Sequence, residues 1–303
     1  MKTPHLIKYL AIAFLPLALV ACGGGGGGGS STPGNVTTSY LGFSGQSAWT
    51  SNGSGTVTSV GTFNQGTSGA TYTETVNASN IIQSSSFTSS TGTGISFNVA
   101  NGDTIANITS GALNGLGIVS YNSNLANVMI TARASQNGWD YQSYGVWMSG
   151  YNSSAGTVGA ASVGSLTLGS AIPTSGTGNF TGNSAGMYVT NAGTHFFEAS
   201  AMTANVNFAT RSIAFATTNS GIGQYVNSNF VSTPGLNMTG TLSYAAATNQ
   251  FSGTVTTAGG GGVGVLTGTA TGKFYGPTAT EIGGTLAVRN GLESLATGFG
   301  GKR

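Results

Sequence analysis

Short runs in which apolar and polar residues alternate recur from about residue 38 onward, separated by clusters of Gly, Asn, Ser and Thr. In the clearest run, Met202, Ala204, Val206 and Phe208 alternate with polar residues. A period of two places the apolar side chains on one face of a β-strand. Further runs with this pattern are 128–132, 213–215, 242–244, 251–255 and 266–274. The sequence therefore predicts an all-β protein.

The glycine content and the low charge favour a closed barrel. The chain has 52 Gly, only 5% charged residues and 39% hydrophobic residues, and its slightly positive mean hydropathy argues against disorder. Glycine inside strands permits the sharp coiling of small barrels. A weakly charged sheet has few guards against edge-to-edge pairing, and a closed barrel has no edges. Residues 245–250 are expected to form a hairpin loop, and 292–297 one helical turn at most.

Residues 1–21 are typical of a secretory signal peptide. Lys2 and Lys8 precede an apolar run from Leu10 to Val20, which is too short for a stable membrane span. The run leads into Ala21, Cys22 and Gly23, which resembles the lipobox of bacterial lipoproteins, where a cysteine receives acyl chains. The alternative is an ordinary cleaved signal in which Cys22 is incidental.

We expect Cys22 to be lipidated and to anchor the protein to the outer membrane, because several acyl chains hold a protein firmly. Cys22 is the one cysteine of the chain, so disulfides within the chain are excluded. Gly23 to Gly29 follow it without interruption. Residues 22–37 are therefore predicted to be a flexible tether that lets the folded part stand clear of the lipid headgroups.

The charge pattern excludes nucleic-acid binding. Lys2 and Lys8 belong to the leader, which leaves six basic and six acidic residues in the rest of the chain. Without a basic stripe there is no source of phosphate affinity. A partner steered by long-range electrostatics is equally unexpected.

The residues that catalysis or a metal requires are few. Gly182-Asn183-Ser184-Ala185-Gly186 matches the Gly-x-Ser-x-Gly pattern of hydrolases, but a match is expected by chance in so Gly- and Ser-rich a chain, and no strand-to-helix elbow is evident. His195, the one histidine after the leader, is either a haem or metal ligand or an ordinary residue near a strand end. It lacks metal-binding partners at suitable spacing. Gly259 to Gly264 lack the helix of a dinucleotide site. The sequence thus indicates no enzyme, no cofactor and no metal site.

Four residues are weak candidates for ligand binding: Trp49, Trp139, Tyr141 and His195. Aromatic residues are enriched in binding hot spots, and His195 lies beside Phe196 and Phe197. Tyr144 and Trp147 belong to an expected strand and are assigned to the core.

The segment from Gly272 to Leu286, which contains Phe274-Tyr275-Gly276-Pro277 and Gly283-Gly284-Thr285, resembles the closing motif of the barrels of transferrin-binding protein B and related surface lipoproteins. In that family, a strand ending in Phe-Tyr-Gly-Pro leads to a final strand beginning near Gly-Gly-Thr, which closes an eight-stranded antiparallel barrel. Residues 172–182 and 205–208 resemble further segments of the family's barrel, and Tyr144-Gly145-Val146-Trp147 resembles its first strand.

The resemblance implies a small barrel over residues 139–303 and a β-rich, handle-like N-terminal region over residues 38–138. It also implies a surface-exposed outer-membrane lipoprotein that binds a host protein, haem or another nutrient, beside an outer-membrane transporter or translocon. The chain is shorter than the larger members and lacks a charged docking face, which argues against transferrin as the ligand. The alternative is a structural or adhesive surface lipoprotein that uses the barrel as a scaffold.

Overall fold

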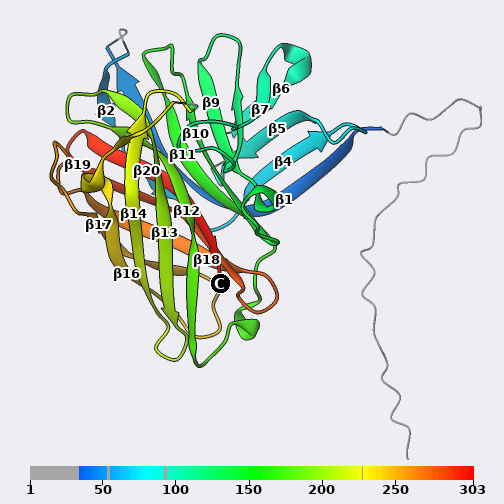
Figure 1. Ribbon diagram of the computed structural model, residues 1–303, viewed down its shortest axis with the longest axis vertical. Coiled ribbons are helices and arrows are strands. Elements are labelled where there is room, and N and C mark those ends of the chain that lie inside the picture. Colours follow the sequence, from blue (N-terminus) through cyan, green and yellow to red (C-terminus); the bar gives the residue numbers. More distant parts are fainter. Residues whose placement is uncertain (1–33, 53–54, 92–93, 227) are drawn as a thin grey trace, which may run out of the picture. The chain divides into compact units, whose positions relative to one another are not determined.

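The computed structural model describes residues 34–52, 55–91, 94–226 and 228–303. Over these residues the chain forms twenty strands and four single-turn helices, and the strands make two antiparallel sheets (Figure 1). The expected all-β fold, with an eight-stranded antiparallel barrel after a β-rich handle-like region, is confirmed. In the described part of the chain, no helix has the length and apolar character needed to cross a membrane. The expected signal peptide, Cys22 and the seven glycines lie outside the described residues, and the end of the expected tether overlaps the first strand, which begins at Val36.

The first sheet is built from the N-terminal half of the chain and has the strand order β6-β5-β4-β1-β11-β10-β9-β8-β7. Two short strands, β2 (Val57–Val60) and β3 (Asn64–Gln65), pair with β1 as well. The main strands are β1 (Val36–Ser51), β4 (Ala70–Val76), β5 (Ile82–Thr88), β6 (Gly94–Asn98), β7 (Thr104–Asn107), β8 (Gly117–Tyr121), β9 (Asn127–Ala132), β10 (Gln142–Ser149) and β11 (Ala155–Gly164). The long strand β1 lies in the middle of this sheet, between β4 and β11.

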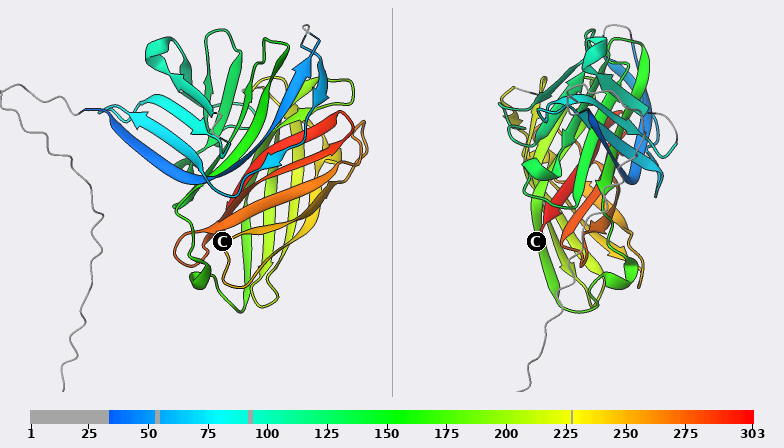
Figure 2. Two further views of the ribbon diagram at one scale, coloured as in Figure 1. Left: turned by 180° about the vertical axis from the view of Figure 1, so that it is seen from behind. Right: turned by 90° about the vertical axis from the view of Figure 1, so that its right-hand side faces the viewer.

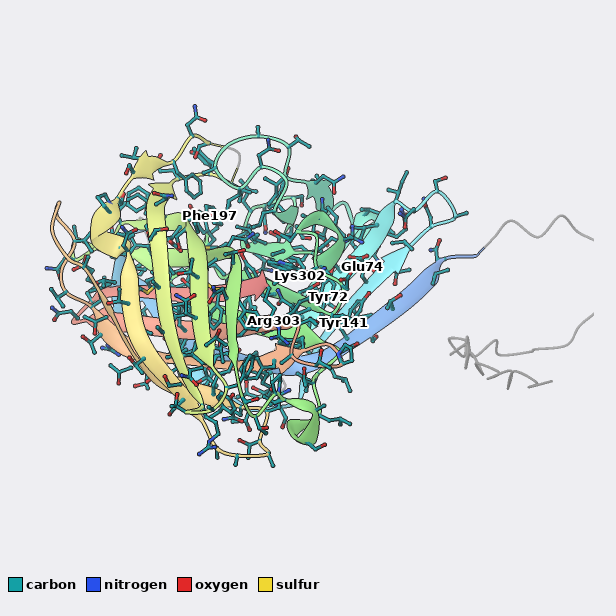
Figure 3. All side chains as sticks on the ribbon, turned by 60° about the horizontal axis from the view of Figure 1, so that its bottom comes forward. Tyr72, Glu74, Tyr141, Phe197, Lys302 and Arg303 are labelled. Carbon is teal, nitrogen blue, oxygen red and sulfur yellow. The ribbon has the colours of Figure 1, made fainter. Side chains whose placement is uncertain are left out.

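Both faces of the first sheet are buried along β10. Trp147 packs on one side against Tyr72 and Phe87, whereas Tyr144 and Val146 face the barrel on the other. Because alternate residues enter two different cores, residues 144–148 read as an almost continuous apolar run. In the same sheet, Glu74 accepts hydrogen bonds from Tyr72 and Arg133, a buried cluster labelled in part in Figure 3.

The second sheet closes into a barrel. Its order is β13-β12-β20-β19-β18-β17-β16-β14, and β13 also pairs with β14. The strands are β12 (Thr177–Val189), β13 (His195–Asn207), β14 (Ser212–Gly223), β16 (Met238–Tyr244), β17 (Phe251–Thr257), β18 (Thr267–Tyr275), β19 (Glu281–Asn290) and β20 (Glu293–Lys302), with the short β15 (Val231–Ser232) beside β14. Figure 2 shows the barrel from two further sides, in green to red.

Aromatic rings fill one end of the barrel. The ring of Phe274 is fully buried and lies 5.3 Å from that of Tyr244 and 5.4 Å from that of Phe251, between ring centroids. Phe180 and Phe208 complete the cluster at 6.2 and 6.1 Å. The inward residues alternate along the strands as the sequence predicts, with Met202, Ala204 and Val206 all buried in this core.

Four expectations about the strands are wrong. Tyr144–Trp147 belongs to β10 of the first sheet, where it pairs with β9 and β11, and is not the first barrel strand. The barrel strands begin at Thr177 rather than near residue 139. The strand that begins near Gly283 is not the last one either, because β20 follows it and pairs with both β19 and β12. Residues 292–297, expected to form at most a helical turn, lie largely in β20. Alternation identifies strands but not the sheet that each one joins.

The carboxylate of Glu281 joins the barrel to the first sheet. It is fully buried at the start of β19. It accepts hydrogen bonds from three consecutive backbone N–H groups just before and at the start of β10: Asp140 at 2.6 Å, Tyr141 at 2.9 Å and Gln142 at 3.0 Å. Tyr275 adds a second connection, because its hydroxyl lies 2.7 Å from that of Ser162 on β11. These four hydrogen bonds form one of the contacts between the two sheets.

The paired glycines of the C-terminal motif make room on opposite faces of β19. A Cβ atom on Gly283 would lie 2.6 Å from Oε1 of Gln142, on the side of the first sheet. A Cβ atom on Gly284 would lie 2.4 Å from the ring of Phe299, inside the barrel. These distances are shorter than van der Waals contact, so each glycine permits one close approach.

Replacing Glu281 with Ala is expected to lower the free energy of unfolding by about 3 kcal/mol or more, because it leaves several buried N–H groups without an acceptor. Urea denaturation measures the effect. The control is Asp140→Asn, which removes the exposed ion pair of Asp140 with Lys302 and should cost less than about 1 kcal/mol. Equal losses in the two variants would contradict the role of Glu281.

Candidate binding sites

Ser184 is not placed for catalysis. It is fully buried on an inward-facing position of β12, and its hydroxyl lies 2.6 Å from that of Ser200. His195 is the first residue of β13 and pairs with Val189 on β12. In the described part of the chain, no group of three or more His, Cys, Asp or Glu residues is arranged to hold a metal ion. A serine that meets neither a base nor solvent has no route to nucleophilic chemistry.

Glu198 is a buried acid within the barrel. It lies opposite Gly186 on an inward position of β13, is fully buried, and neither carboxyl oxygen has a hydrogen-bond partner. Burial raises its pKa from 4.5 to about 8, although the nearby Ser200 hydroxyl opposes the rise. The side chain is therefore mostly a neutral acid at pH 7.

Trp139 and Tyr141 lie at the joint between the sheets and do not form a shared exposed surface for a ligand. Trp139 is buried, with its ring centroid 6.1 Å from that of Tyr144. The backbone of Tyr141 is held by Glu281, and its ring lies close to Gly276. Figure 3 shows Tyr141, Lys302 and Arg303 in the central part of its view. Their placement indicates a structural role.

The structure brings the other two candidates, Trp49 and His195, to one cavity of about 280 Å³. We call it the junction cavity, since the first sheet forms one side and the outer wall of the barrel forms the other. Trp49 is buried there, and its indole N–H donates to the carbonyl of Ser149. Sequence reasoning missed most of the lining, including Phe63, Met148 and Arg289.

A second hollow, of about 340 Å³, lies where loops of both sheets meet. We call it the loop-end hollow; it is lined by Val119, Tyr121, Leu125, Val128, Tyr151, Phe197, Gln224, Tyr225 and Val226. Leu125 and Tyr225 are 52% and 69% exposed at its rim. Leu125 has a φ of 57°, a conformation that is uncommon for a residue other than glycine. None of the described residues that line this hollow is charged, so it offers an apolar surface edged with tyrosines.

The sequence of the barrel decides the family. Residues 172–303 match the family model described as the C-lobe and N-lobe beta barrels of Tf-binding protein B. This segment is similar to the barrels of the transferrin-binding protein B family. The resemblance inferred from Gly272 to Leu286 is thereby confirmed. The closing strands, the Phe274 cluster and Glu281 all lie within the matched residues.

Several solved structures are similar to the chain. One is a mutant of Transferrin Binding Protein B from Haemophilus parasuis, with 11% identity over 89% of this chain and 77% of that one and a TM-score of 0.45. A mutant of the same antigen from Actinobacillus pleuropneumoniae gives 13% identity, 87% and 99% coverage and a TM-score of 0.44. A structure described as a surface lipoprotein gives 14%, 86% and 98%, and 0.46. No curated protein matches the sequence.

The buried acid of the barrel makes stability depend on pH. Because folding raises the pKa of Glu198 from 4.5 to about 8, the native state holds its proton more tightly than the unfolded chain. Stability from this group is complete below about pH 4.5 and is lost as the pH rises through about 8. At about 1.4 kcal/mol for each pKa unit, the full loss is about 5 kcal/mol.

In Glu198→Gln this dependence is absent. The stability difference between variant and wild type, measured by urea denaturation at several pH values, should grow in favour of the variant from pH 4 to pH 9. Comparing the two proteins at each pH cancels the contributions of the other carboxylates. A constant difference across this range would show that Glu198 does not titrate as described.

Proposed function

We propose that the protein is an outer-membrane lipoprotein, anchored through Cys22, that stands on the cell surface and captures a protein partner. The observation that carries the proposal is the match of residues 172–303 to the barrels of Tf-binding protein B. Three further features are consistent with such a protein: the lipobox, the glycine-rich segment that follows Cys22, and the handle-like first sheet. It acts as a binding protein and not as an enzyme.

The loop-end hollow is the surface that fits a protein partner best. Its lining is apolar and tyrosine-rich, and it combines loops of both sheets. Tyrosine is enriched in protein interfaces, and charged residues are depleted from the centres of interfaces. A near-neutral chain cannot rely on electrostatic steering, so affinity comes from apolar contact at this end.

The partner belongs to the host, and the capture supports nutrient uptake through an outer-membrane transporter. Transferrin is one probe, because residues 172–303 match the barrels of Tf-binding protein B. Intact cells expressing the protein are exposed to protease and then incubated with serum proteins, transferrin included. Release by the protease and saturable capture of one serum protein support the proposal. Retention behind the outer membrane, or no saturable capture, would favour a structural or adhesive role.

The double variant Leu125→Asn/Tyr225→Ala is expected to weaken capture of the partner by about tenfold or more, since each change removes an exposed apolar contact. Asn suits the positive φ of residue 125, so the fold should keep its stability. Leu168→Asn is the matched control, because Leu168 is 73% exposed and does not line the hollow. Binding curves that weaken equally in both variants would place the partner elsewhere.

Cys22→Ala is expected to abolish labelling with radioactive palmitate and to leave the protein unattached to the outer membrane, because the acyl chains have no thiol to join. Cell fractionation after labelling measures both effects. Ser31→Ala, a change in the same segment, should leave both unchanged. Membrane attachment that survives in Cys22→Ala would refute the lipid anchor.

A further inference from the structure

The wall of the junction cavity is divided into a polar and an apolar row of residues. Strand pairing on the barrel aligns His195 with Val189, Val189 with Ser294, and Ser294 with Arg289, across β13, β12, β20 and β19. Two residues further along the same strands, Met187 aligns with Ala296, and Ala296 with Ala287. All these side chains lie on the outer face of the barrel and line the cavity. The rows lie about 7 Å apart, the distance of two residues along a strand.

The first sheet covers the apolar row. Trp49 and Phe63 line the cavity from this side, together with Met148 and Val158. An aromatic and aliphatic roof over an alanine-rich wall is suited to a flat or linear apolar group. The volume of about 280 Å³ lies just below the range for pockets of drug-sized molecules, roughly 300 to 1,000 Å³, and so suits a smaller ligand.

The polar row carries the charge of the site. Among the described residues that line the cavity, Arg289 is the one that is charged, and none is acidic. Its guanidinium donates two long hydrogen bonds to described residues, at 3.3 Å to the carbonyl of Gly61 and 3.4 Å to that of Gly291. A guanidinium held this loosely is available to an anion, and a carboxylate matches its geometry.

His195 supplies an unused hydrogen-bonding group at the other end of the polar row. Its Nδ1 is buried and has no hydrogen-bond partner. The rings of His195 and Tyr151 meet edge to face, with their centroids 4.6 Å apart. Burial lowers the pKa of His195, so the imidazole is neutral at physiological pH. A buried nitrogen without a partner is costly, and a bound polar group relieves that cost.

We propose that the junction cavity binds a small amphipathic carboxylate, with its apolar body between the Met187–Ala296–Ala287 row and the roof of Trp49 and Phe63, and its carboxylate on the polar row at Arg289. This site is separate from the loop-end hollow, and the ligand class goes beyond the capture of a protein partner. It requires both sheets, since neither one encloses the cavity alone.

Isothermal titration of the purified protein with octanoate tests the proposal, and 1-octanol is the neutral match. Octanoate should bind saturably at one site, about tenfold or more tighter than octanol, which corresponds to 1.4 kcal/mol or more. Arg289→Gln should weaken octanoate about tenfold and leave octanol unchanged. The control Arg303→Gln removes an exposed guanidinium that does not line the cavity and should change neither affinity.

Ala287→Phe should abolish binding of both probes by filling the apolar row. A second measurement does not depend on that variant folding: 8-bromooctanoate should quench tryptophan fluorescence, and Trp49→Phe should remove most of the quenching. The proposal is overturned by no saturable binding, by equal affinity for octanol, by equal effects of Arg289→Gln and Arg303→Gln, or by quenching that persists in Trp49→Phe. Loss of protein capture in the Leu125→Asn/Tyr225→Ala variant does not bear on these outcomes, so the two proposals fail separately.

Discussion

One buried carboxylate, that of Glu281, ties the barrel to the first sheet. Glu281 accepts hydrogen bonds from three successive backbone amides just before and at the start of β10. From there, β10 packs against the barrel. A charge without solvent needs several donors, and these amides also need an acceptor. The same contact holds the start of β10 against the barrel, and Met148 near the other end of β10 lines the junction cavity.

Much of the fold is predictable from local patterns. Alternation located the strands around Met202 and Phe274, and the turn at 245–250 lies between β16 and β17 as expected. The sheet that a strand joins is a long-range property. The apolar run at Tyr144 fits a barrel strand as well as a strand buried on both faces, and only the pairing with β9 and β11 distinguishes them. The Gly-Gly motif marks a strand correctly, yet nothing local shows that β20 still follows it.

The candidate sites were predictable only in part, for a related reason. Trp49 and His195 are candidates because of their side-chain types, and they line one cavity although they are far apart in sequence. Trp139 and Tyr141 are predicted on the same grounds, but the structure places them in the packing and hydrogen bonding of the joint. Arg289 gave no local signal, because its importance depends on a row of residues on four strands. A surface made by strand register is not visible in the order of residues along the chain.

The closing strand determines when the barrel can form. Because Thr181 on β12 pairs with Lys302 on β20, the cylinder stays open until residue 302 has been synthesised. Closure by such distant segments is slow compared with local folding. Until closure, the strands at the two ends of the barrel have unpaired edges, which can pair with other chains. The order of the strands along the chain therefore makes barrel closure a late step of folding.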